Sequence, residues 1–401
     1  MKKTTKFLLG ATIIIILMII MYFTYQVLNK NTNQDGNIIT NFFPNILDFI
    51  QSSDINIPLI NNSSDDGDLE ESLFYQIPNH ISADFILNTS SSTITTSATS
   101  SIERISNFIV SAEKTTGHLY FYDLGEKIMT RLSNTTISNV DSIYNSYDKE
   151  KLYIYLSAQS GIGRQDYSYN FNPGAVESRV TNVIKLNPFI NIKAGVNNLL
   201  YWKNTDTNFI YQGNANLSNT NTILTNSKID WLYNPTNTGL FVNQKPSAFK
   251  NTSVYLLKNN ALEKIISNKS DLTILPSPDS QYILYTNTNR TYLHDVKTNT
   301  STQLSFFTPI EKCSWVEDSL SFYCSTPTTN SFSITDWYMG ISQLTNSQIV
   351  SINVDNPQKF YPTISLPDGI DVEKLTTINE GGYIVFKNKI DKSLWVLKLI
   401  I

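Results

Sequence analysis

Hydrophobic and polar positions follow two different patterns along this chain. The first is a mostly apolar run without charged residues from Phe7 to Val27, which follows lysines at positions 2, 3 and 6. A helix needs roughly 20 apolar residues to cross a bilayer, and flanking lysines favour the cytoplasmic side. We therefore expect residues 1–28 to be a cytoplasmic stub and a transmembrane signal anchor. The protein would pass the cell membrane once, with its N-terminus cytoplasmic and its C-terminal domain outside. A cleaved secretory signal is the alternative, although no small-x-small site follows the run.

The segment after this run has the composition of a linker. Residues 31–36 are polar and rich in turn formers, and residues 63–71 are acidic. Such segments cannot bury enough apolar surface to fold alone. The apolar patch between them, residues 42–50, is either a short amphipathic helix on the membrane surface or a sticky part of the linker. We expect residues 29–71 to be a flexible tether.

The second pattern begins at about residue 72, where short apolar runs alternate with turn residues. In the clearest unit, Leu275–Thr286 supplies two strands joined by a turn at Pro278-Asp279, and two more strands follow up to Ser305. The next unit repeats this pattern over Cys313–Cys324, with Asp318 placed 39 residues after Asp279. A period near 40 residues with four strands per unit is typical of a β-propeller blade.

Five further units match less closely, so residues 72–401 are predicted to form an all-β, seven-bladed β-propeller. The first unit is expected to open with a strand at 83–87 and a Ser/Thr-rich loop at 90–101. The last unit stops at its third strand, residues 394–399, while residues 72–77 form a strand that no unit uses. Pairing these two segments would close the ring without an open edge. An eight-bladed ring and a sandwich of two β domains remain open, because the third and fourth units are weakly marked.

Several stretches carry a family resemblance. Leu275–Thr286 resembles the repeat of TolB-like and WD-repeat-like bacterial propellers. Other landmarks resemble those of uncharacterised, membrane-anchored propeller proteins from small-genome uncultured bacteria: Thr116–Tyr120, Arg131–Ile137, Glu311–Trp315, Phe322–Cys324 and Asp336–Gly340. The resemblance covers roughly residues 70–401. It implies a propeller held at a membrane and implies no activity.

Charge and motif content point to few chemistries. The formal net charge is −4 and lysine and arginine are scattered, so no basic stripe indicates a nucleic-acid partner. The three histidines, His80, His118 and His294, lack metal-ligand spacing, and no Gly-x-Ser-x-Gly elbow occurs. We expect no catalytic residue, no cofactor and no metal site. The sequence leaves open a set of acidic and amide side chains that separate blades bring together in the channel.

The two cysteines are Cys313 and Cys324. If Asp318 and Ser319 form a two-residue hairpin turn, the cysteines face each other with Cα atoms roughly 4.5 to 5.5 Å apart, within disulfide range. A location outside the cytoplasm would permit oxidation. They are therefore a disulfide candidate, and the alternative is a pair of buried free thiols beside Trp315.

The insertion between Cys324 and Ile349 is the best candidate for a functional surface. It places Trp337, Tyr338 and Met339 in a loop between two strands. Aromatic side chains and methionine are enriched where proteins contact partners. We name these three as partner-binding candidates. The equal alternative is a loop that folds back and plugs its own blade.

Two functions of different classes follow from these features. The first is an extracytoplasmic propeller that acts as a binding or scaffold module for a protein, a peptide or a cell-envelope glycan. The alternative is a channel-sited, metal-dependent hydrolase or lyase of the propeller type. Three or four acidic or amide side chains converging at one mouth of the channel would favour the enzyme.

Overall fold

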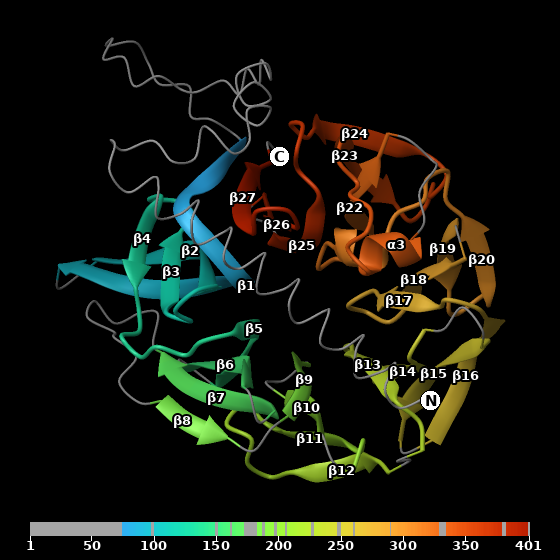
Figure 1. Ribbon diagram of the computed structural model, residues 1–401, viewed down its shortest axis with the longest axis horizontal. Helices are drawn as coiled ribbons and strands as arrows, with labels where there is room; N and C mark the ends of the chain where they lie inside the picture. Colours follow the sequence, from blue (N-terminus) through green and yellow to red (C-terminus); the bar gives the residue numbers. More distant parts are fainter. Residues whose placement is uncertain are drawn as a thin grey trace, which may run out of the picture. The chain divides into compact units, whose positions relative to one another are not determined.

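A ring of β-sheets makes up the described part of the computed structural model (Figure 1). The structure describes residues 74–399 except 98–99, 149–150, 161–162, 172–182, 187–188, 196–198, 205–206, 226–227, 247–249, 260, 289, 329–333 and 379–381. The predicted anchor, residues 1–28, and the predicted tether, residues 29–71, both lie outside the described residues.

Five of the sheets contain four antiparallel strands each. The first two are β5 (Val140–Asp148), β6 (Lys151–Ser160), β7 (Gly163–Phe171) and β8 (Val183–Leu186), then β9 (Phe189–Ala194), β10 (Leu199–Asn204), β11 (Ile210–Asn214) and β12 (Asn221–Leu224). The next two are β13 (Trp231–Pro235), β14 (Leu240–Gln244), β15 (Thr252–Lys258) and β16 (Ala261–Lys269), then β17 (Thr273–Pro276), β18 (Tyr282–Asn287), β19 (Arg290–Asp295) and β20 (Thr300–Gln303). The fifth contains β21 (Cys313–Trp315), β22 (Ser321–Pro327), β23 (Ser347–Asn353) and β24 (Phe360–Ser365).

The remaining strands form one sheet of seven, in the order β25-β26-β27-β1-β2-β3-β4. Their bounds are β25 (Val372–Ile378), β26 (Tyr383–Asn388), β27 (Ser393–Lys398), β1 (Phe74–Ser97), β2 (Ser100–Glu113), β3 (Leu119–Asp123) and β4 (Ile128–Arg131). The predicted count of seven blades is therefore wrong, because five separate blades are found in the described residues. The physical reason is β1, a continuous strand of 24 residues that pairs with β27 through its first part and with β2 through its second.

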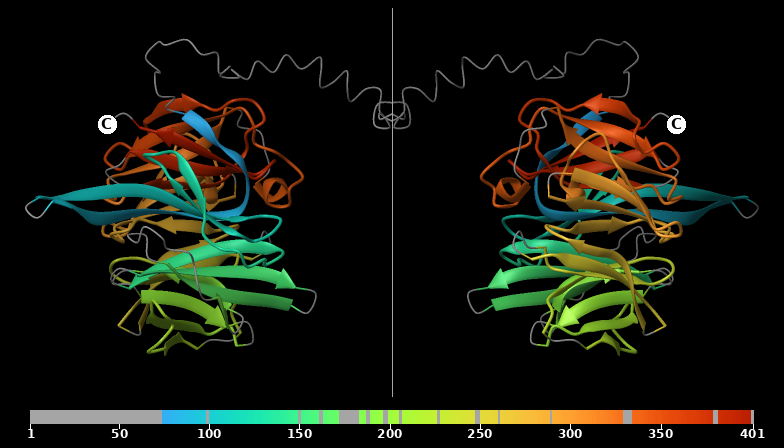
Figure 2. Two further views of the ribbon diagram at one scale, coloured as in Figure 1. Left: turned by 90° about the vertical axis from the view of Figure 1, so that its left-hand side faces the viewer. Right: turned by 90° about the vertical axis from the view of Figure 1, so that its right-hand side faces the viewer.

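The first and the last described strands, β1 and β27, pair with each other, as the sequence predicted. Phe74 pairs with Leu397, Tyr75 with Val396 and Gln76 with Trp395. The strand at 72–77 was predicted to pair with the last strand of the chain. These three residue pairs confirm that prediction. The predicted Ser/Thr-rich loop at 90–101 is instead part of a long hairpin, in which Ser90 pairs with Ser106 and Ser97 with Ser100. Figure 2 shows this β1–β2 hairpin extending beyond the neighbouring sheets.

Helical structure is scarce in the part of the chain that the structure describes. It consists of the α-helix α3 (Ile334–Tyr338) and the 3-10 helix η2 (Ile310–Lys312). A five-residue α-helix rises roughly 7.5 Å, against about 30 Å for the hydrocarbon core of a bilayer. No helix among the described residues is long and apolar enough to cross a membrane. The predicted single-pass membrane location thus has no support in the described residues, and the apolar run that motivated it lies outside them.

The local chemistry of the clearest unit explains its strands and turn. Asp279 accepts hydrogen bonds from the Ser277 hydroxyl (2.6 Å) and the Gln281 amide (3.0 Å), which closes the turn between β17 and β18. The next unit has the same turn, where Asp318 accepts from the Leu320 amide at 2.9 Å. Ser280 and Ser319 occupy equivalent positions with φ of 69° and 61°. Short Asx side chains stabilise such turns because they satisfy nearby backbone amides.

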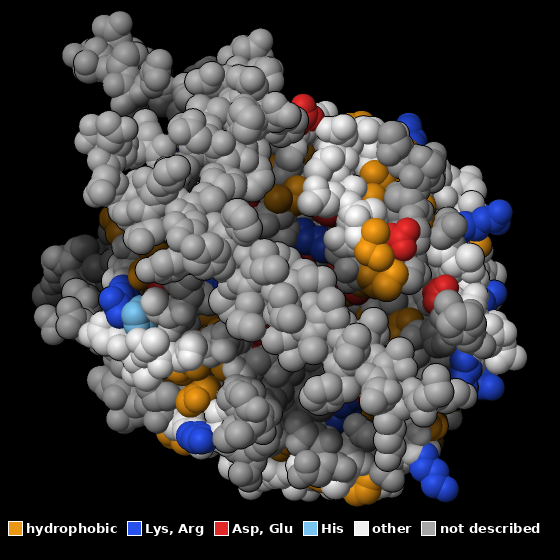
Figure 3. Space-filling model, viewed as in Figure 1, with side chains coloured by type: hydrophobic (Ala, Val, Ile, Leu, Met, Phe, Trp, Pro, Cys, Tyr) orange, Lys and Arg blue, Asp and Glu red, His pale blue; other side chains and the backbone are white. Residues whose placement is uncertain are grey.

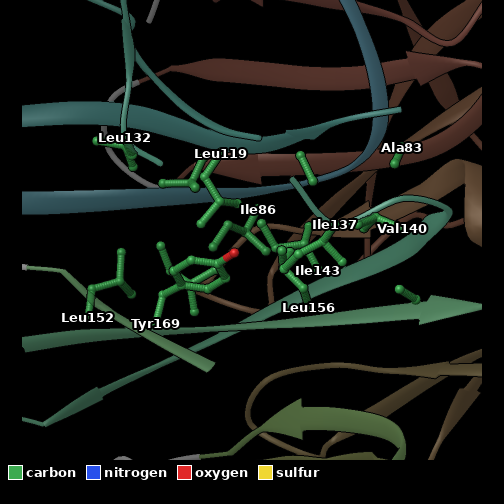
Figure 4. Close-up of a cluster of buried hydrophobic side chains, with 14 of the residues drawn as sticks. Ala83, Ile86, Leu119, Leu132, Ile137, Val140, Ile143, Leu152, Leu156 and Tyr169 are labelled. Atoms are coloured by element: carbon green, nitrogen blue, oxygen red, sulfur yellow. The ribbon is translucent and has the colours of Figure 1, made fainter. Parts of the chain in front are cut away.

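Burial depends on the place of a strand within its sheet. The second strands β10, β14, β18 and β26 are buried almost throughout, whereas the outermost strands β12, β20 and β24 are mostly exposed. Neighbouring sheets cover both faces of a second strand, so its sequence is a continuous apolar run and does not alternate. Figure 4 shows one such packing layer, in which Ile86 and Leu119 meet Ile143 and Tyr169.

A disulfide joins the two cysteines. Cys313 on β21 lies directly opposite Cys324 on β22, with Cα atoms 4.1 Å apart and an S–S distance of 2.09 Å. Both side chains are buried. The bond fastens the innermost strand of this sheet to the second strand, next to Trp315 and the channel described below.

His80 gives the fold a specific dependence on pH. Its side chain is 5% exposed, and its Nε2 lies 2.7 Å from the Ser111 hydroxyl. Burial lowers the pKa of His80 from 6.5 to about 4, against the opposing charge of Glu113. Between these values the unfolded chain binds a proton that the folded chain does not, so stability falls as the pH falls through this window.

We expect His80 to cost about 2 kcal/mol of unfolding free energy when the pH is lowered from 7.5 to 5.0. Urea unfolding of the wild type and of His80→Gln at both pH values measures this difference. The variant should lose less stability than the wild type over the same interval, since glutamine does not titrate. Equal losses in the two proteins would contradict the assignment.

Candidate functional site

The innermost strands of the sheets surround a channel. Strands β5, β9, β13, β17 and β25 face the middle of the ring in Figure 1. A cavity of about 460 Å³ lies there, and its walls come from β9, β13, β14, β17, η2, β21 and β25. Four charged residues line it: Lys193, Glu311, Glu373 and Lys374. A smaller group of residues around Gly195, Pro235 and Trp315 lines a second cavity of about 440 Å³.

Most charges around the first cavity are paired. Lys374 donates to Asp84 Oδ1 and to the Phe85 carbonyl, each at 2.8 Å. Glu373 forms ion pairs with Lys387 and with Lys392, each at 3.1 Å. These pairs connect β25 with β1 and with the ends of β26 and β27. They fix the carboxylates in place and neutralise them.

Lys193 and Glu311 are bound differently. The Lys193 ammonium donates to a neutral group, Asn234 Oδ1, at 2.6 Å. Glu311 accepts a 2.5 Å hydrogen bond from the Tyr338 hydroxyl. Burial lowers the pKa of Lys193 to about 8, with Glu311 opposing this shift and Lys374 adding to it. Burial also raises the pKa of Glu311. Glu311 keeps contact with solvent, but the walls of the channel exclude most bulk water around it.

Trp337 is fixed at the edge of this channel and is not exposed. Its side chain is 3% exposed, and its Nε1 donates to both carboxylate oxygens of Asp371, at 3.1 and 3.0 Å. The Lys389 ammonium lies 3.8 Å from the centre of the ring and donates to the Trp337 carbonyl. Trp337 is therefore buried, but against the ends of β25 and β26 in the neighbouring sheet and not against its own blade.

Asp371 organises the buried end of this loop. Lys312 donates to it at 2.5 Å, and neither side chain of this ion pair has any exposed surface. The Leu344 amide donates to the same carboxylate at 3.1 Å, and the Asp371 amide donates to Asn388 Oδ1 at 3.0 Å. Burial lowers the pKa of Lys312, while Asp371 opposes the shift. A buried charge needs such partners because desolvation is costly.

The other end of the loop faces solvent. Tyr338 is 44%, Met339 60% and Ile341 71% exposed. We call these three residues the α3 surface. In Figure 3 hydrophobic side chains gather over α3 with acidic side chains beside them, and Lys or Arg side chains lie toward the middle of the ring. Two of the three partner-binding candidates, Tyr338 and Met339, thus lie where a partner could reach them.

Each of the three histidines has its own hydrogen-bond partners, and none contacts another histidine. His118 contacts Thr136 at 3.2 Å and Arg131 at 2.9 Å, and His294 contacts Ser301 at 2.9 Å. Among the described residues, no group of three or more His, Cys, Asp or Glu side chains is arranged to hold a metal ion. The acidic groups at the channel lie beside lysines, and the positive charge of these lysines would repel a divalent cation.

Comparison with known proteins identifies the fold. The WD40 repeats of RRP9 match with a TM-score of 0.52 at 9% identity, covering 82% of this chain and 97% of that one. The structure of U3-55K matches with a TM-score of 0.51 at 8% identity, covering 81% and 98%. Kuenenia stuttgartiensis hydrazine synthase matches with a TM-score of 0.51 at 11% identity, covering 73% and 93%. No family model matches the sequence, and no curated protein matches it. At these identities the likeness shows the fold alone, and the chain is a β-propeller.

Sequence reasoning missed the charged residues of the channel. Lys193 lies on β9, Glu373 and Lys374 lie on β25, and Glu311 lies on η2, and the sequence analysis gave none of them a role. The available signal was a charged residue inside the opening strand of a unit, a position that is otherwise apolar or small. Their convergence depends on which strand is innermost and which sheets are neighbours, and no local pattern contains that information.

Proposed function

We propose that this β-propeller is a binding or scaffold module that docks an apolar segment of a partner protein on the α3 surface. The observation that carries the proposal is the concentration of exposed apolar side chains there. Ten large hydrophobic side chains are exposed among the described residues, and three of them fall within residues 338–341. Single exposed apolar residues are ordinary, whereas a contiguous group indicates an interaction site.

The anchoring of Trp337 supports this proposal. Its bonds to Asp371 and its packing against Lys389 hold α3 in one position before any partner arrives. A surface ordered in advance loses less conformational entropy on binding, so more of the contact energy appears as affinity. The hydrogen bond between Tyr338 and Glu311 restrains the exposed aromatic ring in the same way.

The chemistry of the α3 surface favours a protein partner over a glycan. Methionine and isoleucine offer flexible and branched aliphatic contacts, which suit the side chains of a protein segment. Glycan sites rely on flat aromatic rings, and Tyr338 is the one aromatic side chain of this surface. Acidic side chains lie beside the patch in Figure 3, so the partner segment is expected to carry lysine or arginine next to its apolar residues.

A peptide selection tests this proposal. Twelve-residue peptides would be selected on the immobilised full chain, and the Kd of the enriched peptides measured by fluorescence anisotropy. We expect apolar peptides with basic flanks whose affinity falls at least 10-fold in Met339→Asp/Ile341→Asp, since loss of hot-spot contacts costs about 1.4 kcal/mol or more. Ile128→Asp is the matched control, because Ile128 is equally exposed on β4, away from α3.

Two outcomes would contradict the proposal. One is a set of enriched peptides that bind the Met339→Asp/Ile341→Asp variant as tightly as the wild type. The other is a selection in which no peptide sequence rises above background. Both variants carry their substitutions on exposed positions, so thermal melting should confirm that each remains folded.

A further inference from the structure

The cavity in the channel has the size and lining of a small-molecule site. Its volume of about 460 Å³ falls in the range of ligand pockets, roughly 300 to 1,000 Å³. Much of its wall is apolar, and this part consists of Leu232, Ile274, Leu275, Ile310 and Leu375. The charged and amide groups lie on separate elements: Lys193 on β9, Asn234 on β13, Asn243 on β14, Glu311 on η2, and Glu373 and Lys374 on β25.

Lys193 is the group in this cavity whose charge is least compensated. Lys374 and Lys387 each pair with a carboxylate, at 2.8 and 3.1 Å. In the described part of the chain, Lys193 has no carboxylate within ion-pair distance, and its hydrogen-bond partner is the neutral amide of Asn234. An ammonium group carries three donors. Lys193 therefore keeps donors for a further acceptor, and an anion would supply the missing charge.

Asn243 is a further polar side chain of this cavity that the protein does not fully satisfy. It lines the same cavity, it is 1% exposed, and its Oδ1 atom has no hydrogen-bond partner. A buried polar atom without a partner costs free energy, and natural structures satisfy nearly all such atoms. Its Oδ1 atom needs a donor, which a carboxylate does not supply, so the choice of an anion rests on Lys193.

We propose that this cavity binds an organic carboxylate, with its charged group against Lys193 and Lys374 and its apolar body along Leu275 and Leu375. The Glu311 carboxylate also lines this cavity, where it accepts a hydrogen bond from the Tyr338 hydroxyl. The cavity adjoins the α3 surface through the Tyr338–Glu311 hydrogen bond, but the Lys193 variants and the Met339 and Ile341 variants test the two proposals separately.

The pH also controls this site. The titratable or charged groups that face Lys193 are Tyr233 on β13, Glu311 on η2, and Glu373 and Lys374 on β25. Burial places the pKa of Lys193 at about 8, so its charge changes between pH 7 and 9. Affinity for a carboxylate should therefore fall as the pH rises through this interval.

Isothermal titration calorimetry on the full chain tests the proposal with defined probes. The probes are acetate, butanoate, octanoate and 4-phenylbutanoate, each compared with its neutral amide. We expect the larger carboxylates to bind and their amides to bind at least 10-fold more weakly. Lys193→Met should weaken carboxylate binding at least 10-fold without changing amide binding, whereas Lys193→Arg should retain the preference for the acid. Lys264→Met is the control, because Lys264 is exposed on the outer strand β16.

Three results would overturn the proposal. The first is equal affinity for acids and amides, and the second is undiminished carboxylate binding by Lys193→Met. The third is no binding of any carboxylate at 10 mM, a concentration on the order of ten times the largest Kd expected of a specific site. If Lys193→Met does not fold, the Lys193→Arg variant and the pH dependence of the wild type decide. Carboxylate affinity that is constant between pH 7 and 9 then counts against the assignment.

Discussion

Replacing residues 74–77 with Gly-Ser-Gly-Ser should lower the stability of the propeller by about 5 kcal/mol or more. These residues supply the part of β1 that pairs with β27, where Phe74 stacks on Trp395 with ring centres 5.0 Å apart. Ile77 is 1% exposed and packs in the cluster that contains Val385 and Val396. Burying a large aliphatic side chain contributes about 2–5 kcal/mol, and the edge pairing is lost in addition.

The expected loss is a large part of a typical folding free energy of about 5–15 kcal/mol. Thermal melting should show a decrease of about 10 °C or more. The exposed edge of β27 should also promote aggregation, since an unpaired strand is a template for pairing with another chain. The same replacement at residues 31–34, where the sequence predicts a tether, is the control and should leave the Tm nearly unchanged. Equal Tm values for the two variants would show that closure by β1 does not stabilise the ring.

Removing one member of the buried ion pair at α3 should have the second largest effect. In Asp371→Ala, Lys312 loses its carboxylate in a fully buried site, and Trp337 and the Leu344 amide lose their acceptor. Loss of one partner from a buried pair costs about 3–5 kcal/mol, because the remaining charge is desolvated without compensation. Urea unfolding measures this cost. Lys264→Met, an exposed lysine on β16, should change stability by less than about 0.5 kcal/mol.

The double variant Lys312→Met/Asp371→Leu separates the ion pair from its surroundings. It leaves no unpaired charge, so it should be more stable than Asp371→Ala alone. Its unfolding free energy should stay below that of the wild type, because Trp337 Nε1 loses the Asp371 carboxylate as its acceptor. A double variant that costs the sum of both single variants would mean that the two side chains do not stabilise each other.

The sequence by itself determined the features that depend on residues close together in the chain. Strands β17 to β20, and the turns at Asp279 and Asp318, follow from apolar runs and turn residues within one unit. The position of Cys313 opposite Cys324 follows from that same turn, because register in a hairpin is fixed by its loop. Pairing of Phe74–Gln76 with β27 could also be inferred, since an incomplete last unit required a fourth strand.

Only the tertiary structure decided the features that depend on contacts between distant units. Two separate strands and one continuous strand look alike in sequence. The local pattern therefore could not show that two expected strands are one strand, β1, which joins the sheet of seven. The burial of Trp337 depends on Asp371 and Lys389, which lie on later segments of the chain. The meeting of Lys193 with Asn234, Glu311 and Lys374 depends on the closure of the ring, which brings innermost strands from separate sheets to one cavity.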